Sequence, residues 1–511
     1  MDIFAFVLYF VAMVAIGIYF FFKSKAVSEK DYFLGGRAMG PWVTAMSAQA
    51  SDMSAWLLMG LPGSILAFGF GQAWIGIGLA IGTAANWILV AKRLRKFSKA
   101  ADDSITLPQY LSNRFASKSH TVSIICAVVF LVCFTIYVAS AFVAGTDVFT
   151  TLVPSLTRTK AMLIFAAIVV VYTFLGGFNA VCWTDFFQGL LMLAALLIVP
   201  ITIALGDNLD MSALDTVYKS KDGEEFKFVA NFFNASWQDI LSGMGWGLGY
   251  FGMPHIIVRF MAIEKPSMVK KSATVAIIWV VLSLAATIVI AYLGRMFVYD
   301  NGVDLSKELL WEGQQSLVFV KLAKYVFPGF IAGLLLAAII AASMSTADSQ
   351  LLVAASSFTS DLYKPLVRKQ ASNKEILWVS RLVVVAISVV AYFIASSKGK
   401  AAQAIMDLVS NAWGIFGAAF GPAVLLSLFW KRFTYKGAVA GILVGAIVDM
   451  LWLWLPVSGG QTLTAITGVY EIIPGFAIGA IAAIIVTLVD KKPSEEVLAI
   501  YAKGTDDSID D

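Results

Sequence analysis

Two stretches decide the fold of this sequence: residues 47–64 read SAQASDMSAWLLMGLPGS, and residues 241–254 read LSGMGWGLGYFGMP. Each lies in an apolar run long enough to cross a membrane. The first nevertheless carries Asp52 followed by GLPG at 60–63, and the second carries five glycines before Pro254. Glycine loosens a helix and proline removes a backbone donor, so both runs are predicted to unwind locally. Interrupted helices at matching places in two halves of a membrane protein indicate a transporter's midplane site.

Composition places the whole chain in a membrane. Of its 511 residues, 59% are hydrophobic and only 14% are charged, and the mean hydropathy is +0.82. A soluble chain of this length would divide into domains with abundant surface charge. Lipid requires helices, because a helix satisfies its own backbone hydrogen bonds. The sequence therefore predicts an all-α polytopic membrane protein. HExxH, Walker A and paired redox cysteine motifs are missing from the sequence, which argues against an enzyme.

Apolar runs of about twenty residues, the length that crosses roughly 30 Å of hydrocarbon, predict about thirteen transmembrane helices. These spans lie near residues 2–23, 41–66, 70–91, 121–148, 161–181, 184–205, 236–262, 272–298, 327–358, 375–396, 405–430, 436–456 and 472–490.

Charge in the loops gives the orientation. Basic loops, such as 92–99 and 364–374, alternate with acidic loops, such as 206–235 and 299–314. Basic loops stay in the cytoplasm, so the pattern predicts an outer N-terminus, a cytoplasmic C-terminus and an odd number of spans. The expected location is the plasma (inner) membrane.

The two interrupted spans also divide the chain. They start about 195 residues apart and each opens a set of five spans, so the second set is inverted relative to the first. The alternative explanation is close helix packing through small residues. The predicted parts are a leading helix and loop (1–40), a first repeat (41–205), a second repeat (236–430), and two trailing helices with a tail (431–511).

Several long motifs resemble the solute:sodium symporter family. They are GGR at 35–37, the SASDMS-type and GLPG sequence of the first stretch, WTDFFQG at 183–189, the glycine-rich motif GWGLGYFGMPHIIVRFM at 245–261, and MSTADSQLLV at 344–353. The resemblance covers nearly the whole chain and is closest to family members that carry proline. It implies a leucine-transporter-type core of five plus five helices with one leading and two trailing helices. It also implies Na+-coupled symport by alternating access. The alternatives are symport of another small amino acid or a carboxylate, and sodium-independent exchange.

A sodium site is implied between the second and ninth spans. Na+ is a hard cation that prefers oxygen ligands, and carbonyls become free only where a helix unwinds. On the ninth span the candidate ligands stand at i, i+3 and i+4, so they share one helix face. A hydroxyl there also has the option of bonding back to its own helix. The ligands that the resemblance implies are the carbonyls of Ala50, Met53 and Ala342 and the hydroxyls of Ser345 and Thr346.

A solute site is expected beside the sodium site. Trp246, Tyr250 and Pro254 step by four along the glycine-rich span and share one face. The resemblance implies that these three residues line a pocket for a small zwitterion such as proline, which has a compact apolar ring. Ser54 is expected to contact solute or ion. An aromatic stripe that packs on a neighbouring helix is the alternative.

Three carboxylates inside predicted spans complete the candidate site. A buried carboxylate in a membrane is a functional candidate by default, and the family implies that Asp52 raises the affinity for Na+. Asp185, Asp348 and Ser349 lie toward the cytoplasmic ends of two neighbouring helices. Two such carboxylates repel, so they are predicted to hold a second cation or a proton. The alternative is a charge pair that is solvated by the cytoplasmic vestibule or neutralised by a nearby lysine or arginine.

Overall fold

The structure, a computed structural model, describes residues 1–23, 28–175, 177–206, 208–300, 302–397 and 401–506. The first part of the chain forms α1 (Asp2–Lys23), α2 (Glu29–Leu34), η1 (Gly35–Arg37), α3 (Pro41–Met53), η2 (Ala55–Leu57), α4 (Gly60–Phe68), α5 (Phe70–Ala85), η3 (Asn86–Ala91), α6 (Lys92–Ala100), α7 (Leu107–Arg114), α8 (Thr121–Leu152), α9 (Arg158–Leu175), α10 (Phe178–Ala204), β1 (Tyr218–Lys219) and β2 (Glu225–Phe226).

The second part forms α11 (Trp237–Gly245), η6 (Trp246–Phe251), α12 (Pro254–Ala262), α13 (Val269–Met296), β3 (Val298–Tyr299), β4 (Val303–Asp304), α14 (Leu305–Trp311), α15 (Val318–Val326), α16 (Gly329–Ser356), η9 (Ser357–Val367), α17 (Asn373–Ser397), α18 (Ala401–Phe429), α19 (Tyr435–Trp454), β5 (Pro456–Ser458), β6 (Gln461–Thr462), α20 (Leu463–Thr467), α21 (Ile472–Val489) and α22 (Glu495–Thr505).

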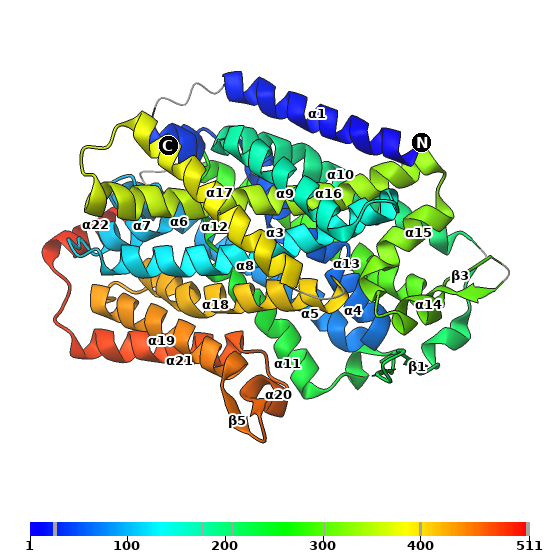
Figure 1. Ribbon diagram of the computed structural model, residues 1–511. Helices are drawn as coiled ribbons and strands as arrows, with labels where there is room; N and C mark the ends of the chain where they lie inside the picture. Colours follow the sequence, from blue (N-terminus) through cyan, green and yellow to red (C-terminus); the bar gives the residue numbers. More distant parts are fainter. Residues whose placement is uncertain (24–27, 176, 207, 301, 398–400, 507–511) are drawn as a thin grey trace.

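The long helices lie roughly along one direction, as Figure 1 shows. The hairpins β1–β2 and β3–β4 lie at one end with the N-terminus, and α6, α7 and α22 lie at the other end. The second end carries the basic loops and is called the basic end below. Because α1 begins at the first end and α22 lies at the second, the arrangement agrees with an odd number of crossings.

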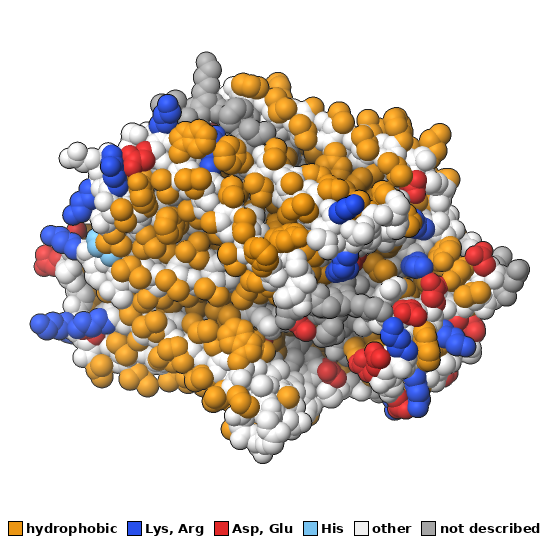
Figure 2. Space-filling model, viewed as in Figure 1, with side chains coloured by type: hydrophobic (Ala, Val, Ile, Leu, Met, Phe, Trp, Pro, Cys, Tyr) orange, Lys and Arg blue, Asp and Glu red, His pale blue; other side chains and the backbone are white. Residues whose placement is uncertain are grey.

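Ten helices among the described residues are long and apolar enough to cross a membrane. This confirms the all-α polytopic fold, whereas the count of thirteen spans stays a prediction. The three other predicted spans correspond to α9 and to the two helices that break, α3–α4 and α11–α12. Figure 2 shows hydrophobic side chains covering the middle of the visible face and charged side chains gathered toward its two ends. That distribution suits a lipid-facing belt.

The predicted unwinding of the first stretch is present. α3 ends at Met53, and Ser54 adopts a φ of +48°. A positive φ is uncommon for a residue other than glycine and is found where surrounding structure enforces it, often at functional sites. The Ser54 side chain accepts a 3.1 Å hydrogen bond from the backbone N–H of Trp56, which starts the short helix η2. Helical pairing resumes at α4.

The second stretch breaks differently. Residues 246–251 form the 3₁₀ helix η6 between α11 and α12, and Pro254 then occupies the first turn of α12. A 3₁₀ segment inside a helix often marks a hinge. Glycine is required here by close packing, because a Cβ on Gly249 would lie 2.0 Å from Nε1 of Trp413 on α18. The breaks therefore lie at the positions that the sequence predicts.

Candidate functional site

Asp52 lies where the two broken helices meet. The Tyr250 hydroxyl donates a 2.6 Å hydrogen bond to Oδ2 of Asp52, and the Asp52 side chain is buried. Nearby, Nε2 of His255 lies 3.1 Å from the carbonyl oxygen of Ser51. The amide of Asn86 donates to the carbonyl oxygen of Tyr250 at 3.0 Å, which fixes η6 from the other side. Asp52 thus anchors the 3₁₀ segment against the end of α3.

An oxygen-rich cluster lies between α3 and α16. The Ser345 hydroxyl donates to the carbonyl of Ala50 at 2.8 Å and to that of Ala342 at 3.2 Å. Thr346 is 1% exposed, and its hydroxyl has no hydrogen-bond partner among the described residues. Met53 is the last residue of α3, directly before the unwound Ser54. The expected sodium ligands Ala50, Ala342 and Ser345 are therefore brought together, with an unsatisfied hydroxyl beside them.

An aromatic cavity of about 10 Å³ lies next to this cluster, with Trp246 and Tyr250 in its wall. A volume of ~10–15 Å³ holds about one water molecule, so side chains must move apart to admit a larger solute. The complete lining consists of Asp52, Met53, Trp56, Leu79, Tyr137, Trp246, Tyr250, Val409 and Trp413. The other two expected contacts lie differently: Ser54 caps η2, and Pro254 begins α12.

Sequence reasoning missed much of the cavity wall. The Trp56 ring stacks on Trp246 with centroids 5.3 Å apart, and Tyr470 stacks on Trp246 at 5.2 Å. Trp413 meets Tyr250 edge to face at 5.1 Å and donates its indole N–H to the carbonyl of Trp246 at 2.8 Å. Trp56 was signalled by its place in the broken stretch. Trp413, on α18, and Tyr470, in the loop between α20 and α21, lie outside any such pattern.

A second polar cluster joins α3, α10, α12 and α16. Ser47 donates to Oδ2 of Asp185 at 2.7 Å, and Nη2 of Arg259 donates to the same oxygen at 3.1 Å. Arg259 also donates to the hydroxyl of Ser349, which in turn donates to Oδ1 of Asp348 at 3.3 Å. Every side chain in this cluster is buried.

Arg259 was not expected in this cluster, although it stands in the glycine-rich motif as the only charged residue of 245–261. The guanidinium pairs with Asp185, as the alternative of a neutralised charge pair anticipates. One guanidinium faces two carboxylates, however. Oδ1 of Asp185 and Oδ2 of Asp348 are buried and have no hydrogen-bond partner among the described residues. Unpaired buried carboxylate oxygens are costly unless a proton or cation satisfies them.

The known proteins that this chain resembles are membrane transporters. The sequence profile described as "Sodium:solute symporter family" matches residues 32–445. The sodium/proline symporter of Haemophilus influenzae is 41% identical over 507 residues, covering 98% of this chain and 97% of its own. The high-affinity proline transporter PutP of Bacillus subtilis is 42% identical over 487 residues, covering 95% and 97%.

A solved structure shows the same fold. A substrate-bound, outward-open Na+-coupled sialic acid symporter superimposes with a TM-score of 0.74 at 20% identity, covering 96% of this chain and 98% of its own. The predicted leucine-transporter-type fold is therefore confirmed.

Proposed function

Because the chain belongs to the sodium:solute symporter family, we propose that it carries L-proline into the cell together with Na+ by alternating access. The observation that carries the proposal is the meeting of two broken helices at Asp52, with an oxygen cluster on one side and an aromatic cavity on the other. The relatives named above support proline as the solute. The protein is a transporter and not an enzyme.

Na+ is proposed to bind between α3 and α16. The ligands are the carbonyls of Ala50, Met53 and Ala342 with the hydroxyls of Ser345 and Thr346, all of them oxygens. The hydrogen bonds from Ser345 to two carbonyls support this set, because the carbonyl lone pairs that now accept from the hydroxyl can coordinate Na+ once the hydroxyl turns. Asp52 lies between the proposed ligand residues Ala50 and Met53 in the sequence, so its carboxylate adds negative potential near the ion. Its hydrogen bond to Tyr250 links ion binding to η6.

Proline is proposed to bind in the aromatic cavity. Trp246 and Tyr250 offer a flat apolar wall for the pyrrolidine ring, and backbone groups freed at the helix breaks offer partners for the zwitterion. Ser54 and Pro254 act at the edges of this site, where each sets the end of a broken segment.

A second cation station is proposed at Asp185, Asp348 and Ser349. Two carboxylates share one guanidinium, so one negative charge remains for a Na+ ion or a proton. This station lies between four helices of the core, where such a charge is coupled to their relative movement.

The proposed setting is the inner membrane with the basic end in the cytoplasm. The proposed repeats are 41–205 and 236–430, since the broken helices α3–α4 and α11–α12 stand at the start of each.

The test is uptake of labelled proline into proteoliposomes. Proline should accumulate above its external concentration when an inward Na+ gradient is imposed, and should only equilibrate when K+ replaces Na+. Accumulation without Na+, driven by internal amino acid, would instead establish an exchanger. Competition by unlabelled amino acids and carboxylates then defines the solute, and another solute that outcompetes proline would overturn the assignment.

A further inference from the structure

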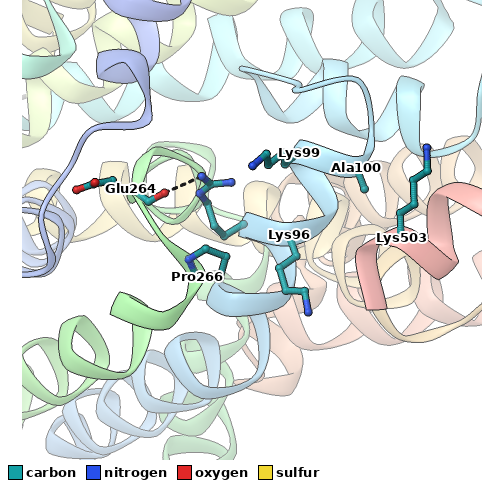
Figure 3. Close-up of a pocket in the computed structure, with 7 residues that line it drawn as sticks. Lys96, Lys99, Ala100, Glu264, Pro266 and Lys503 are labelled. Carbon is teal, nitrogen blue, oxygen red and sulfur yellow. Dashed lines mark hydrogen bonds between the residues drawn. The ribbon is translucent and has the colours of Figure 1, made fainter. Parts of the chain in front are cut away.

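A basic pocket at the basic end takes no part in the proposed transport site. It has a volume of about 130 Å³ and lies between α6, the segment that follows α12, and α22, as Figure 3 shows. This volume is several times the ~10–15 Å³ that one water needs, so a group of several heavy atoms fits. The lining consists of Arg95, Lys96, Lys99, Ala100, Glu264, Pro266 and Lys503.

Arg95 provides the strongest sign of a ligand. It is only 4% exposed, and it donates from Nε to the carbonyl of Ile263 at 2.6 Å and from Nη2 to that of Glu264 at 2.9 Å. Both acceptors are neutral carbonyls. Its third nitrogen, Nη1, is buried without a hydrogen-bond partner among the described residues. A buried cationic donor is costly unless an acceptor satisfies it, and an anion does so most effectively.

The charge of the pocket favours the same ligand. Four of its seven lining residues are basic and one is acidic. Figure 3 shows the carboxylate of Glu264 pointing away from Lys96, Lys99 and Lys503. It is the carbonyl oxygen of Glu264, and not this carboxylate, that accepts the hydrogen bond from Arg95. The nearby carboxylate of Asp103 is already paired with Lys30 and Arg37. Positive charge therefore dominates the space in front of Nη1.

The position of the pocket along the membrane-crossing helix suits a lipid headgroup. The helix that crosses the membrane from Phe70 continues through η3 into α6 and ends at Ala100. Lys96 and Lys99 thus stand on its last turn and a half, five and eight residues beyond the predicted apolar span 70–91. Basic pockets between helices on the cytoplasmic side bind the headgroups of anionic lipids.

We propose that this pocket binds the phosphate of an anionic phospholipid. Nη1 of Arg95 donates to the phosphate, and Lys99 and Lys503 complete a cationic rim from two different helices. A bound phosphate would join α6 and α22 to the segment that follows the inner half of the second broken helix. Since Arg95 already holds that segment, the lipid favours the state in which the basic end is closed. This consequence for transport rests on the proposed function, whereas the binding itself does not.

The binding test uses the purified, delipidated full-length protein. Phosphatidylglycerol should raise its melting temperature saturably, and phosphatidylcholine should not. The double variant Lys99→Gln/Lys503→Gln should bind phosphatidylglycerol roughly thirtyfold more weakly, since each basic group near an anionic surface strengthens binding about fivefold. Arg95 is left unchanged because its bonds to Ile263 and Glu264 are structural. The matched control is Lys431→Gln/Lys492→Gln, two exposed lysines in loops at the same end that do not line the pocket.

The other outcomes are decisive as well. Equal binding by wild type and the double variant overturns the proposal. Saturable stabilisation by inorganic phosphate alone, with no added effect of the lipid, assigns the site to a soluble phosphate and overturns the lipid source. The chain ends in the acidic sequence TDDSIDD. If phosphatidylglycerol binds only after removal of residues 506–511, the tail is the occupant and the proposal fails. None of these readouts requires transport, so their failure leaves the proposed symport standing.

Discussion

At the scale of single residues, the arrangement of oxygens on α16 separates ion ligands from ordinary helix hydroxyls. Ser343 donates to the carbonyl of Ile339 on its own helix at 2.9 Å, which is the bond that a serine inside a helix usually makes. Ser345 bonds Ala342 on its own helix at 3.2 Å but also reaches across to Ala50 on α3 at 2.8 Å, and the hydroxyl of Thr346 has no partner among the described residues. The difference makes Ser343 an internal control for its neighbours.

The first prediction follows from this contrast. Ser345→Ala and Thr346→Ala should each raise the Na+ concentration for half-maximal proline uptake by about tenfold or more, because one bond to a charged group contributes ~1.5–3 kcal/mol. Ser343→Ala should leave the Na+ dependence unchanged. Uptake at graded Na+ in proteoliposomes measures the effect, with insertion checked by protein amount. Wild-type Na+ dependence in both variants would remove these hydroxyls from the site.

A second prediction concerns the aromatic wall. Trp246→Ala removes the ring that lies between Trp56 and Tyr470, so proline affinity should fall by at least about tenfold, while Na+ binding measured without proline should change little. Trp378→Ala is the matched control, because the Trp378 side chain lies on α17 and is 48% exposed. Isothermal titration with each ligand gives both affinities. Parallel loss of the two would indicate a packing role.

The candidate site was only partly predictable from sequence at this scale. Asp52 was predictable because it is a carboxylate inside an apolar run. Trp246 and Tyr250 were predictable because they stand four residues apart in the glycine-rich span. Trp413 and Tyr470 were not, because neither interrupts an apolar run. Only tertiary packing brings Trp413 into the cavity wall and Tyr470 against the Trp246 ring. Arg259 shows the same limit: its sequence position indicates burial, but its pairing with Asp185 depends on how four helices meet.

At the scale of elements, the two breaks have different physical origins. α3 ends because Ser54 adopts a left-handed backbone, whereas the second break is a 3₁₀ helix that fits between α5 and α18 only because its glycines have no side chains. Sequence predicted both breaks, since glycine, proline and a carboxylate stand out in apolar runs. It did not predict the 3₁₀ geometry, which close contact with Trp413 requires.

The prediction at this scale is that Gly249→Ala abolishes proline binding without unfolding the protein. Its new Cβ would fall 2.0 Å from Nε1 of Trp413, so either η6 or α18 must shift and the cavity wall must change with it. Gly40→Ala is the control, because a Cβ at Gly40 meets nothing within 4 Å. Proline binding and melting temperature, measured together, decide the outcome. Normal proline affinity in Gly249→Ala would show that η6 does not shape the pocket.

At the scale of the whole molecule, the buried carboxylate at the helix breaks and the two carboxylates of the second polar cluster are neutralised differently. Asp52 has a hydroxyl partner and lies next to the proposed sodium site, whereas Asp185 and Asp348 share one arginine. Asp348→Ser removes the surplus charge and should change at least one of three quantities: the Hill coefficient for Na+, the charge moved per proline, or the pH dependence of uptake. Ser356→Ala, whose hydroxyl bonds Val353 on the same helix, is the control. If all three quantities are unchanged, the second station should be abandoned.

The basic end is closed by a network around Arg37. This buried guanidinium donates to Asp103 at 2.8 Å, to Ser98 at 3.1 Å and to the carbonyl of Ser104 at 2.8 Å. It also donates to the carbonyl of Met261 near the end of α12, and therefore ties the inner half of the broken helix to its neighbours.

Titration should not open this network near neutral pH. Burial raises the pKa of Asp103, but Lys30 and Arg37 lower it by more, so the net pKa lies below its ordinary value. A depressed carboxyl pKa adds stability that is fully present above the ordinary value of about 3.9 and is lost as pH falls through the lower folded value. The Asp103 carboxylate therefore stays charged across the physiological pH range, and its titration does not change the network there.

The last prediction uses a thiol already present in the chain. Cys182 is fully buried on α10 beside Arg259, three residues before Asp185, so it reports whether the space behind the Arg37 network opens. Arg37→Gln removes the charge that holds α12, and loss of one partner from a buried, hydrogen-bonded charge costs ~2–5 kcal/mol. Maleimide should then label Cys182 at least about tenfold faster than in wild type, with Cys182→Ser identifying the site. Cys126 and Cys133, buried on α8, are internal controls and should stay unreactive. Faster labelling of all three cysteines would mean general loosening, and unchanged labelling of Cys182 would mean that Arg37 does not gate the basic end.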